Sequence, residues 1–375
     1  MTPTGIVLLE FHPERDDLGK GKELRDGLSV VLQIGDTLWL ANDETISLER
    51  LTLEKGENAD EYRYARQHKQ FSLNDYLPLP IPPTGDPEDV QEVDVEGLAY
   101  EDGYLWLVGS HSLKRKKPKL KDGVKKAQKQ LAKCNSEANR YLLARIPIVE
   151  SDKTFELEKE TTRRGKTCTA AMLPIRDESN ALLDALSEDE HLAPFMAIPG
   201  KDNGFDIEGL AVVDKRLFLG LRGPVLRGWA VILELEVTED EDDGSLLKLK
   251  GIGRDGRPYR KHFLQLGGLG IRDMCVHGDD LVILAGPTMD LDGPVIIFRW
   301  KDGAAPEEES MVAADALSRV LDVPFGEGVD HAEGMCLFSS DGRKADKLLV
   351  VYDAASVSRQ LGESTLAADV FALPG

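Results

Sequence analysis

The stretch VEGLAYEDGYLWLVG at residues 95–109 is the part of the sequence that decides the predicted fold. Two short apolar runs flank the dipeptide Asp102-Gly103, which is typical of a tight turn between antiparallel strands. Related stretches are IEGLAVVDKRLFLG at 207–220 and IRDMCVHGDDLVILAG at 271–286. In all three, seven residues separate the apolar residue of the motif from a leucine in the second run (98 to 105, 210 to 217, 274 to 281). The recurring step predicts one hairpin, repeated.

Two further copies extend the repeat toward both ends of the chain. AEGMC at 332–336 precedes the run LLVVYD at 348–353, and the looser RDGLS at 25–29 precedes LWLAND at 38–43. A third and a fourth strand-like stretch follow each hairpin. Four antiparallel strands per repeat are typical of a propeller blade. The sequence therefore predicts an all-β fold, a β-propeller of about five four-stranded blades. A sixth, degenerate blade between residues 151 and 200 is the alternative count.

The ends of the chain and the long second repeat complete the predicted organisation. Apolar strands at 5–11 and 368–373 have no partner nearby in the sequence, so we expect them to pair and close the ring. Apolar residues recur at helical spacing from Leu120 to Ala138, which predicts a basic helical insertion at 113–140 in the second blade. A short acidic helix is expected at 176–192. We expect residues 1–375 to form a single domain.

Composition narrows the class of protein. The formal net charge of −21 makes nucleic acid an unlikely partner for most of the surface. Neither a transmembrane run nor a secretory signal is evident, and no membrane association is expected. The four cysteines form no Cys-x-x-Cys pair, which argues against a zinc site and a disulfide framework. These features predict a cytoplasmic protein of bacterial type. Its protein partners stay open.

One segment runs against the acidic composition. Residues 114–133 contain ten Lys or Arg residues and a single acid, Asp122. The segment could form a helical lid that attracts an anionic substrate or polymer. The alternative is a solvated helix face, which is the common role of a charge run. No aromatic residues are interleaved, so single-stranded nucleic acid gains no support.

The acids of the motif are the first candidate site residues. The first strand of a propeller blade lies beside the axis, where glycine allows the backbones to approach closely. The residues expected to converge there are Glu96, Glu208, Glu333, Asp26 and Asp273. Such carboxylates cannot all stay charged without compensation, so Ca²⁺ or Mg²⁺, protonation or arginine would have to neutralise them. Arg272, which replaces the acid in the fourth copy, favours neutralisation by arginine. Alternatively, each acid accepts backbone N–H groups from the next blade.

Polar residues at the ends of the second strands are further candidates for this face, among them Asp43 and Asp353. His111 could act as a general base toward a phosphate or carboxylate ester, or be a loop histidine in a polar turn. Arg222 could hold a small anionic molecule, or pair with the acid of a neighbouring blade.

The Glu-Gly-Leu-Ala hairpins, with GLRGP at 220–224 and AGP at 285–287, resemble a bacterial family of unknown function from about residue 25 to residue 353. This resemblance implies a propeller and little more. More distantly, the repeat is similar to esterase-like phytases and calcium-dependent lactonase or nucleotidase propellers, in which acids of the channel hold a metal. Glu96, Glu208 and Glu333 match that pattern, and Arg272 departs from it.

Two function hypotheses follow. The first is a metal-dependent hydrolase of phosphate or lactone-like esters at the propeller axis, with Ca²⁺ or Mg²⁺ held by the motif acids, His111 as base and Arg222 orienting the anion. The second is a non-catalytic propeller that serves as a ligand- or protein-binding scaffold. No nucleotide-binding glycine loop, zinc-protease motif or serine-hydrolase elbow is present, and no organic cofactor is expected.

Overall fold

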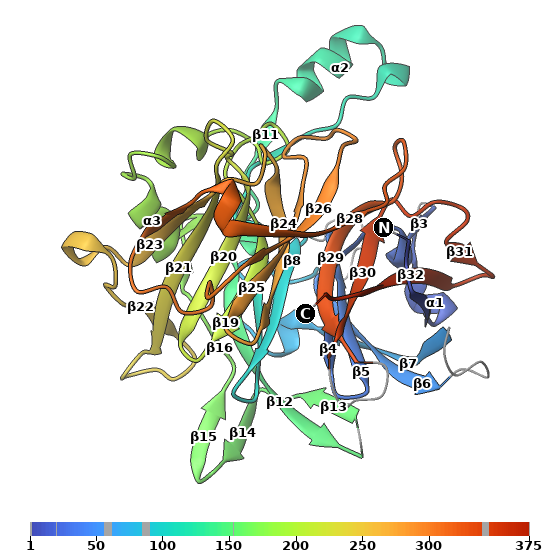
Figure 1. Ribbon diagram of the computed structural model, residues 1–375, viewed down its shortest axis with the longest axis horizontal. Coiled ribbons are helices and arrows are strands. Elements are labelled where there is room, and N and C mark those ends of the chain that lie inside the picture. The colour runs from blue at the N-terminus through green and yellow to red at the C-terminus, as the bar shows by residue number, and fades with distance from the viewer. Residues whose placement is uncertain are drawn as a thin grey trace.

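The computed structural model describes residues 2–19, 21–55, 62–84, 91–152, 154–339 and 345–374. Within them, five inner strands surround a common axis, and each packs against the inner strand of the next blade (Figure 1). In ring order these strands are β4 (Leu28–Ile34), β8 (Val95–Glu101), β19 (Asp206–Val213), β24 (Gly270–His277) and β29 (His331–Phe338). The fold is the predicted all-β propeller, and its blade count is five.

The outer strands of each blade follow by antiparallel pairing. Blade 1 adds β5 (Thr37–Asn42), β6 (Ser47–Lys55) and β7 (Tyr62–Ser72). Blade 2 adds β9 (Tyr104–Gly109), β12 (Leu143–Ser151), β13 (Thr154–Leu157) and β16 (Ala171–Met172). Blade 3 adds β20 (Arg216–Gly223), β21 (Ala230–Glu239), β22 (Leu247–Leu249) and β23 (Tyr259–Leu264). Blade 4 adds β25 (Asp280–Gly286), β26 (Val295–Trp300) and β28 (Leu317–Val323), and its β27 (Ser310–Val312) pairs in parallel with β23.

Blade 5 is built from both ends of the chain. Its strands β30 (Lys347–Asp353) and β32 (Thr365–Ala372) are joined by β1 (Gly5–Glu10). Strand β1 pairs antiparallel with β32 along its whole length and in parallel with β7 of blade 1. The predicted pairing of the terminal strands is therefore confirmed, and it fastens the last blade to the first.

Short elements connect the blades. The two-strand ladders are β2 (Asp17–Gly19) with β3 (Lys22–Glu23), β10 (Lys114–Arg115) with β11 (Cys134–Asn135), β14 (Glu160–Arg163) with β15 (Lys166–Thr169), and β17 (Ile175–Arg176) with β18 (Ser179–Asn180). Strand β31 (Gln360–Leu361) pairs with β32, and helix α1 spans Pro13–Asp16. Residues 151–200 thus hold small ladders and a helix, and the described part of this segment contains no sixth blade.

Glycine after the motif residue allows neighbouring inner strands to approach closely, as the sequence predicted. A Cβ atom on Gly97 would lie 2.5 Å from Cβ of Leu210 in the next blade. A Cβ atom on Gly334 would lie 2.7 Å from Cα of Val30. Apolar side chains fill the rest of the space between the blades. Trp39 of blade 1, for example, belongs to the same buried cluster as Leu107 of blade 2.

The helices are shorter than the sequence pattern suggested. Helix α2 covers only Val124–Leu131, and α3 covers Ala181–Leu186. Leu120 and Val124 are 79% and 68% exposed, so the apolar spacing in this insertion does not correspond to packing on the body. Helix α2 projects from the edge of the propeller (Figure 1). Within the described ranges, no helix has the length and apolar character needed to cross a bilayer.

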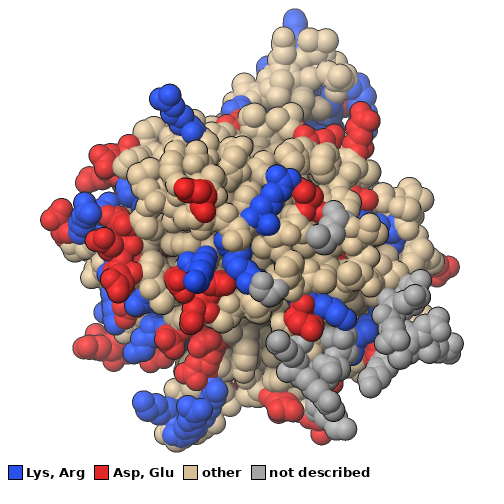
Figure 2. Space-filling view, in the orientation of Figure 1, with Lys and Arg blue, Asp and Glu red and all other residues tan. Residues whose placement is uncertain are grey.

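Charge is distributed unevenly over the surface. Figure 2 shows Lys and Arg side chains around α2 at the top of the view, while acidic side chains, with basic ones among them, gather along the left edge over the blade that contains β21. The basic insertion therefore extends away from an acidic body.

Candidate functional site

A β-bulge interrupts every inner strand at an equivalent position. The bulged residues are Ser29, Glu96, Glu208, Arg272 and Glu333. A bulge places one extra residue on one strand and redirects its side chain. Of the five, all except Ser29 line pockets at the end of the axis where the inner strands begin and the second strands end. The bulge is thus the local device that turns the motif residue toward the axis.

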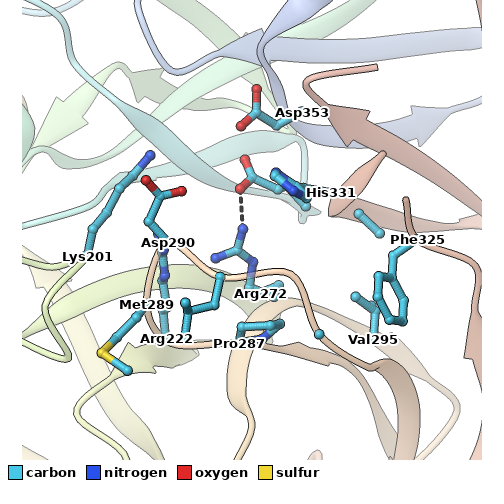
Figure 3. Close-up of a pocket in the computed structure, with 14 residues that line it drawn as sticks. Lys201, Arg222, Arg272, Pro287, Met289, Asp290, Val295, Phe325, His331 and Asp353 are labelled. Atoms are coloured by element: carbon cyan, nitrogen blue, oxygen red, sulfur yellow. Dashed lines mark hydrogen bonds and ion pairs between the residues drawn. The ribbon is translucent and has the colours of Figure 1, made fainter. Parts of the chain in front are cut away.

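A cavity of about 810 Å³ occupies this end of the axis. Side chains from all five blades line it, including Asp43, Glu96, Glu208, Asp290 and Glu333. Thirteen Asp or Glu residues and seven Lys or Arg residues contribute to its wall. The wall therefore carries an excess of negative charge. A side pocket lined by Arg272, Phe325 and Val295 opens beside it (Figure 3).

Two arginines, Arg222 and Arg272, form ion pairs with the motif acids Glu208 and Glu333. Arg222 donates from Nη1 to Glu208 Oε1 at 2.7 Å and from Nε to the carbonyl oxygen of Thr288 at 3.0 Å. Arg272 places Nη1 3.2 Å from Glu208 Oε2 and pairs through Nη2 with Glu333. Neutralisation by arginine, one of the alternatives left open by the sequence, is therefore present in blades 3 to 5. Because Arg222 is occupied in this way, the geometry does not support its expected contact with an anion.

A second pair of acids lies just before the bulges. Arg140 pairs through Nη2 with Asp94 and donates from Nη1 to the carbonyl oxygen of Ser112 at 3.3 Å. Asp206 lies 3.7 Å from Arg222 Nη1. Burial and the neighbouring Glu208 raise the pKa of Asp206 from 3.8 to about 7. This carboxyl group would exchange a proton near neutral pH.

Glu96 and Asp43 are the least compensated acids of the cavity. Within the described residues, neither side chain has a hydrogen-bond or ion-pair partner. Burial, reinforced by the charge of Asp94, raises the pKa of both carboxyl groups well above the usual range. The side chain of Lys201, also in the wall, is the cation that most directly opposes Asp43. Both residues line the axial cavity.

Asp26 and Asp273, which the sequence placed in the ring of acids, lie elsewhere. Asp26 belongs to a 3-10 turn before β4, and its Oδ1 accepts a hydrogen bond from Gln360 Nε2 at 3.0 Å. The residue of blade 1 that corresponds to Glu96 is Ser29, three residues after the expected Asp26. Asp273 follows the bulge, at the position that Gly97 occupies in blade 2. A shift of one residue along a strand directs the side chain to the other face.

His111 is also outside the cavity wall. The ring is buried, Nδ1 donates to the carbonyl oxygen of Gly109 at 2.8 Å, and Nε2 accepts from Asn180 Nδ2 at 2.9 Å. Burial lowers the pKa of His111 to about 4. Both ring nitrogens are occupied, so this placement does not support a general base. Of the other predicted face residues, Asp43, Asp353 and Arg222 line the cavity, and Arg272 lines the side pocket.

The arrangement of the acids bears on the expected Ca²⁺ or Mg²⁺ ion. In the part of the chain that the structure describes, no three His, Cys, Asp or Glu residues are grouped as metal ligands. Arginine contacts Glu208 and Glu333, and two backbone N–H groups occupy Asp273. The residues present therefore do not fit a preformed metal site, and a bound metal stays a prediction.

Sequence reasoning missed Arg140 and Lys201. Both come from segments between strands, far in sequence from the acids that they oppose, and neither belongs to the repeat. Arg140 stands shortly before the outer strand β12 and Lys201 shortly before β19, which by itself gives no sign of the acids that they oppose.

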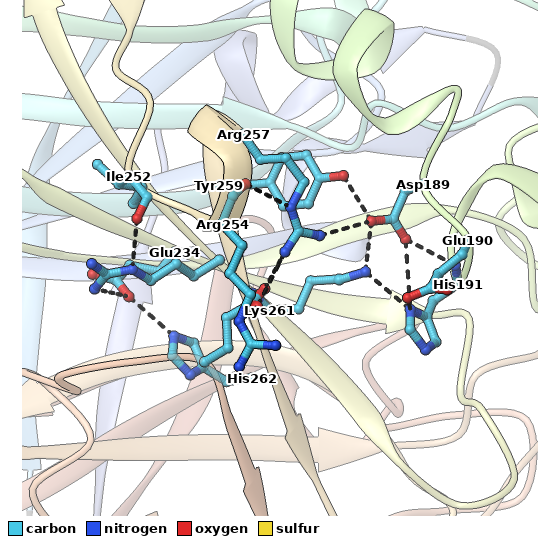
Figure 4. A network of polar contacts seen from close by, with 12 residues as sticks. Asp189, Glu190, His191, Glu234, Ile252, Arg254, Arg257, Tyr259, Lys261 and His262 are labelled. Atoms are coloured by element: carbon cyan, nitrogen blue, oxygen red, sulfur yellow. Dashed lines mark hydrogen bonds and ion pairs between the residues drawn. The ribbon is translucent and has the colours of Figure 1, made fainter.

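A second polar cluster lies on the outer side of blade 3 (Figure 4). Asp189 Oδ2 accepts from Lys261 Nζ at 2.6 Å and from the hydroxyl of Tyr259 at 2.7 Å, and Arg257 contacts both oxygens of Glu309. The acids at the centre of this cluster are already paired with cations of the protein. We interpret this cluster as a structural contact that holds the α3 region against blades 3 and 4.

The fold and the cavity define a five-bladed β-propeller with a charged pocket at one end of its axis. The chain belongs to the family described as "Protein of unknown function (DUF3616)", whose model matches residues 27–369. Membership in a family of unknown function agrees with the resemblance in the hairpin motifs. No match was found among curated proteins.

Three solved structures illustrate how distant the structural relatives are. A protein of Thermus thermophilus described as a putative oxidoreductase (glucose dehydrogenase) has a TM-score of 0.36 and 12% identity, with 98% of this chain and 100% of that chain covered. Sqt1 of Saccharomyces cerevisiae has a TM-score of 0.32 and 11% identity, with both chains fully covered. Hsv2 of Kluyveromyces lactis has a TM-score of 0.28 and 9% identity, covering 87% of this chain and 72% of that chain. Similarity at this level carries no argument about activity.

Proposed function

We propose that the protein binds a small, positively charged organic molecule in the axial cavity. The observation that carries the proposal is the excess of carboxylates over cations in the wall, together with the unpartnered side chains of Glu96 and Asp43 among the described residues. A desolvated carboxyl group without a partner is costly in its charged form. A ligand that brings a cation into the cavity would supply the missing partner and favour ionisation.

This proposal departs from the expected anionic ligand for a physical reason. Arg222 and Arg272 already bind Glu208 and Glu333, and an anion would have to displace these carboxylates. It would also enter a space with thirteen acidic residues in its wall. A cation requires no such exchange.

Calorimetric titration with 1,4-diaminobutane tests the proposal, with acetate and inorganic phosphate at equal ionic strength as comparisons. The amine is expected to bind and the anions are not. Glu96→Gln should weaken amine binding by roughly tenfold, since a charge-assisted hydrogen bond is lost. Glu101→Gln is the matched control, because this residue lies at the opposite end of the same strand, outside the cavity wall. Binding of phosphate but not of the amine would overturn the proposal.

Proton release gives an independent readout. Because the pKa of Glu96 is raised in the free protein, binding of an amine should displace a proton, and the observed heat should depend on the ionisation enthalpy of the buffer. Ca²⁺ and Mg²⁺ belong in the same titration series. Binding of either metal that Glu96→Gln abolishes would favour the predicted metal site over an organic cation.

A second candidate function is hydrolysis of phosphate or lactone-like esters. It is favoured by Asp206, whose pKa of about 7 suits general acid–base catalysis and whose side chain lines the cavity. Activity toward p-nitrophenyl phosphate or a simple lactone that is lost in Asp206→Asn and kept in Asp214→Asn would support it. Asp214 is the control because it lies at the turn of the same hairpin, away from the cavity. Loss of that activity on addition of EDTA would indicate the metal-dependent form.

A further inference from the structure

An apolar rim borders the charged cavity on the side of blade 4. It consists of Met289, Leu291 and Phe325, which are 44%, 60% and 46% exposed. Large apolar side chains in the described residues are mostly buried between blades, so three exposed ones beside one pocket are unusual. Exposed apolar surface next to a pocket commonly marks a contact with a ligand.

The rim and the carboxylates open into one continuous space. The side pocket is lined by the rim residues together with Pro287 and Val295, and it shares Leu291, Glu333 and Asp353 with the axial cavity. Figure 3 shows Pro287, Val295 and Phe325 below and to the right of Arg272, Lys201 and Asp290 to its left and Asp353 above it, while Met289 lies below and to the left. A molecule in this space would meet the carboxylates of the axial cavity at one end and apolar surface at the other, with Lys201, Arg222 and Arg272 also in the lining.

We propose that the ligand is an amphiphilic amine, a small molecule in which one positively charged nitrogen is joined to an apolar chain. This inference rests on the proposed binding of an organic cation and adds the requirement for the chain. The charged nitrogen is placed against the carboxyl groups of Glu96 and Asp43. The chain lies over Leu291 and Phe325 at the mouth of the side pocket, which itself holds only about 40 Å³, and covers apolar surface that is otherwise in contact with water.

Other small molecules fit this space less well. A short polyamine satisfies the carboxylates but leaves the rim exposed. A fatty acid covers the rim, but its carboxylate would have to displace Glu208 or Glu333 from Arg272. An uncharged alcohol covers the rim and leaves Glu96 without a cation. Only the combination of a cation and an apolar chain matches both halves of the lining.

A chain-length series tests the inference on the intact protein. Ethylamine, butylamine and hexylamine are titrated by calorimetry, with hexan-1-ol and hexanoate as comparisons. Affinity should rise with each added methylene group, and hexylamine should bind at least about tenfold more tightly than ethylamine, because apolar surface leaves water. Hexan-1-ol and hexanoate should bind far more weakly than hexylamine.

Substitutions at the rim separate this inference from the proposal beneath it. Leu291→Ser and Phe325→Ser should each reduce the ratio between the dissociation constants of ethylamine and hexylamine. Met311→Ser is the matched control, since Met311 is 68% exposed and outside the cavity. Equal affinity for ethylamine and hexylamine would overturn the apolar requirement and leave cation binding intact. Equal affinity for hexylamine and hexan-1-ol would overturn the need for the cation, and absence of binding by every amine would overturn both proposals.

Discussion

Asp273 Oδ2 accepts the backbone N–H of Met335 at 2.7 Å, while Oδ1 of the same carboxylate accepts the N–H of Met274, also at 2.7 Å. The two methionines belong to β24 and β29, so one buried carboxylate joins the inner strands of two blades. Ser29 makes a comparable link, since its hydroxyl donates to the carbonyl oxygen of Val95 in blade 2 at 2.7 Å. Contacts of this kind hold adjacent blades in register, separately from the charges that line the cavity.

Replacement of Asp273 should therefore affect stability. Asp273→Ala leaves two buried N–H groups without an acceptor, and we expect the free energy of unfolding to fall by about 2–4 kcal/mol. Asp273→Asn keeps one carbonyl oxygen and should lose less. Urea denaturation measures both, with Asp279→Asn in the exposed turn of the same hairpin as the control. An unchanged midpoint for Asp273→Ala would show that the link contributes little.

The second prediction concerns the close approach between the inner strands of neighbouring blades. A Cβ atom on Gly97 would lie 2.5 Å from Leu210 Cβ and 2.9 Å from Val108 Cγ1, so Gly97→Ala must displace the neighbouring inner strand. We expect it to lower the free energy of unfolding by about 1–3 kcal/mol. At Gly244 nothing lies within 4 Å of the added atom, and Gly244→Ala serves as the control. Equal stability of the two variants would contradict the predicted packing constraint.

The sequence was sufficient for the hairpins because their pattern is local. Glu96 and Glu208 stand before glycine in copies with the same seven-residue step, and the side chains of both line the axial cavity. In the first copy, Asp26 and Gly27 resemble the Glu-Gly pair of the motif, but they lie three residues before the bulge at Ser29. The position of a bulge is determined by how the inner strand pairs with the second strand, and no residue type in β4 predicts it.

The composition of the site was less predictable, since it depends on residues brought together by the ring. Asp273 was expected beside Arg272 at the axis, but consecutive residues of a strand point to opposite faces. Arg140 reaches Asp94 from 46 positions further along the chain, at the end of the basic insertion. Such pairs have no spacing that a single sequence reveals. The polar partners of His111 were hidden for the same reason, because Asn180 comes from a different connection.

Ring closure by β1 makes a third prediction. Val7 and Leu9 are fully buried in a core cluster shared by blades 1 and 5, whereas Leu8 points to the other, partly exposed face. Leu9→Ala should lower the free energy of unfolding by about 2–5 kcal/mol, as expected for a large core side chain, and Leu8→Ala should cost clearly less. Thermal or urea unfolding distinguishes them. Equal losses would mean that the alternation of β1 does not determine how the ring is closed.

The buried titratable groups make a fourth prediction, on the pH dependence of stability. The pKa of Asp206 rises from 3.8 to about 7 on folding, so the folded state binds an extra proton between these values. The contribution of this residue is fully present below pH 3.8 and is lost as the pH rises toward about 7. The pKa of His111 falls from 6.5 to about 4, so its contribution has the opposite sign and is lost as the pH falls through this window.

The two groups can be separated by substitution. Asp206→Asn should remove the loss of stability on the approach to neutral pH, so the difference in unfolding free energy between variant and parent should change across that range. His111→Gln removes the titrating ring and should reduce the loss on acidification between pH 6.5 and about 4. Urea midpoints measured at a series of pH values provide both curves. If Asp206→Asn and the parent gave parallel curves, Asp206 would titrate normally in the folded protein, and its candidacy as a general acid–base group would fall with it.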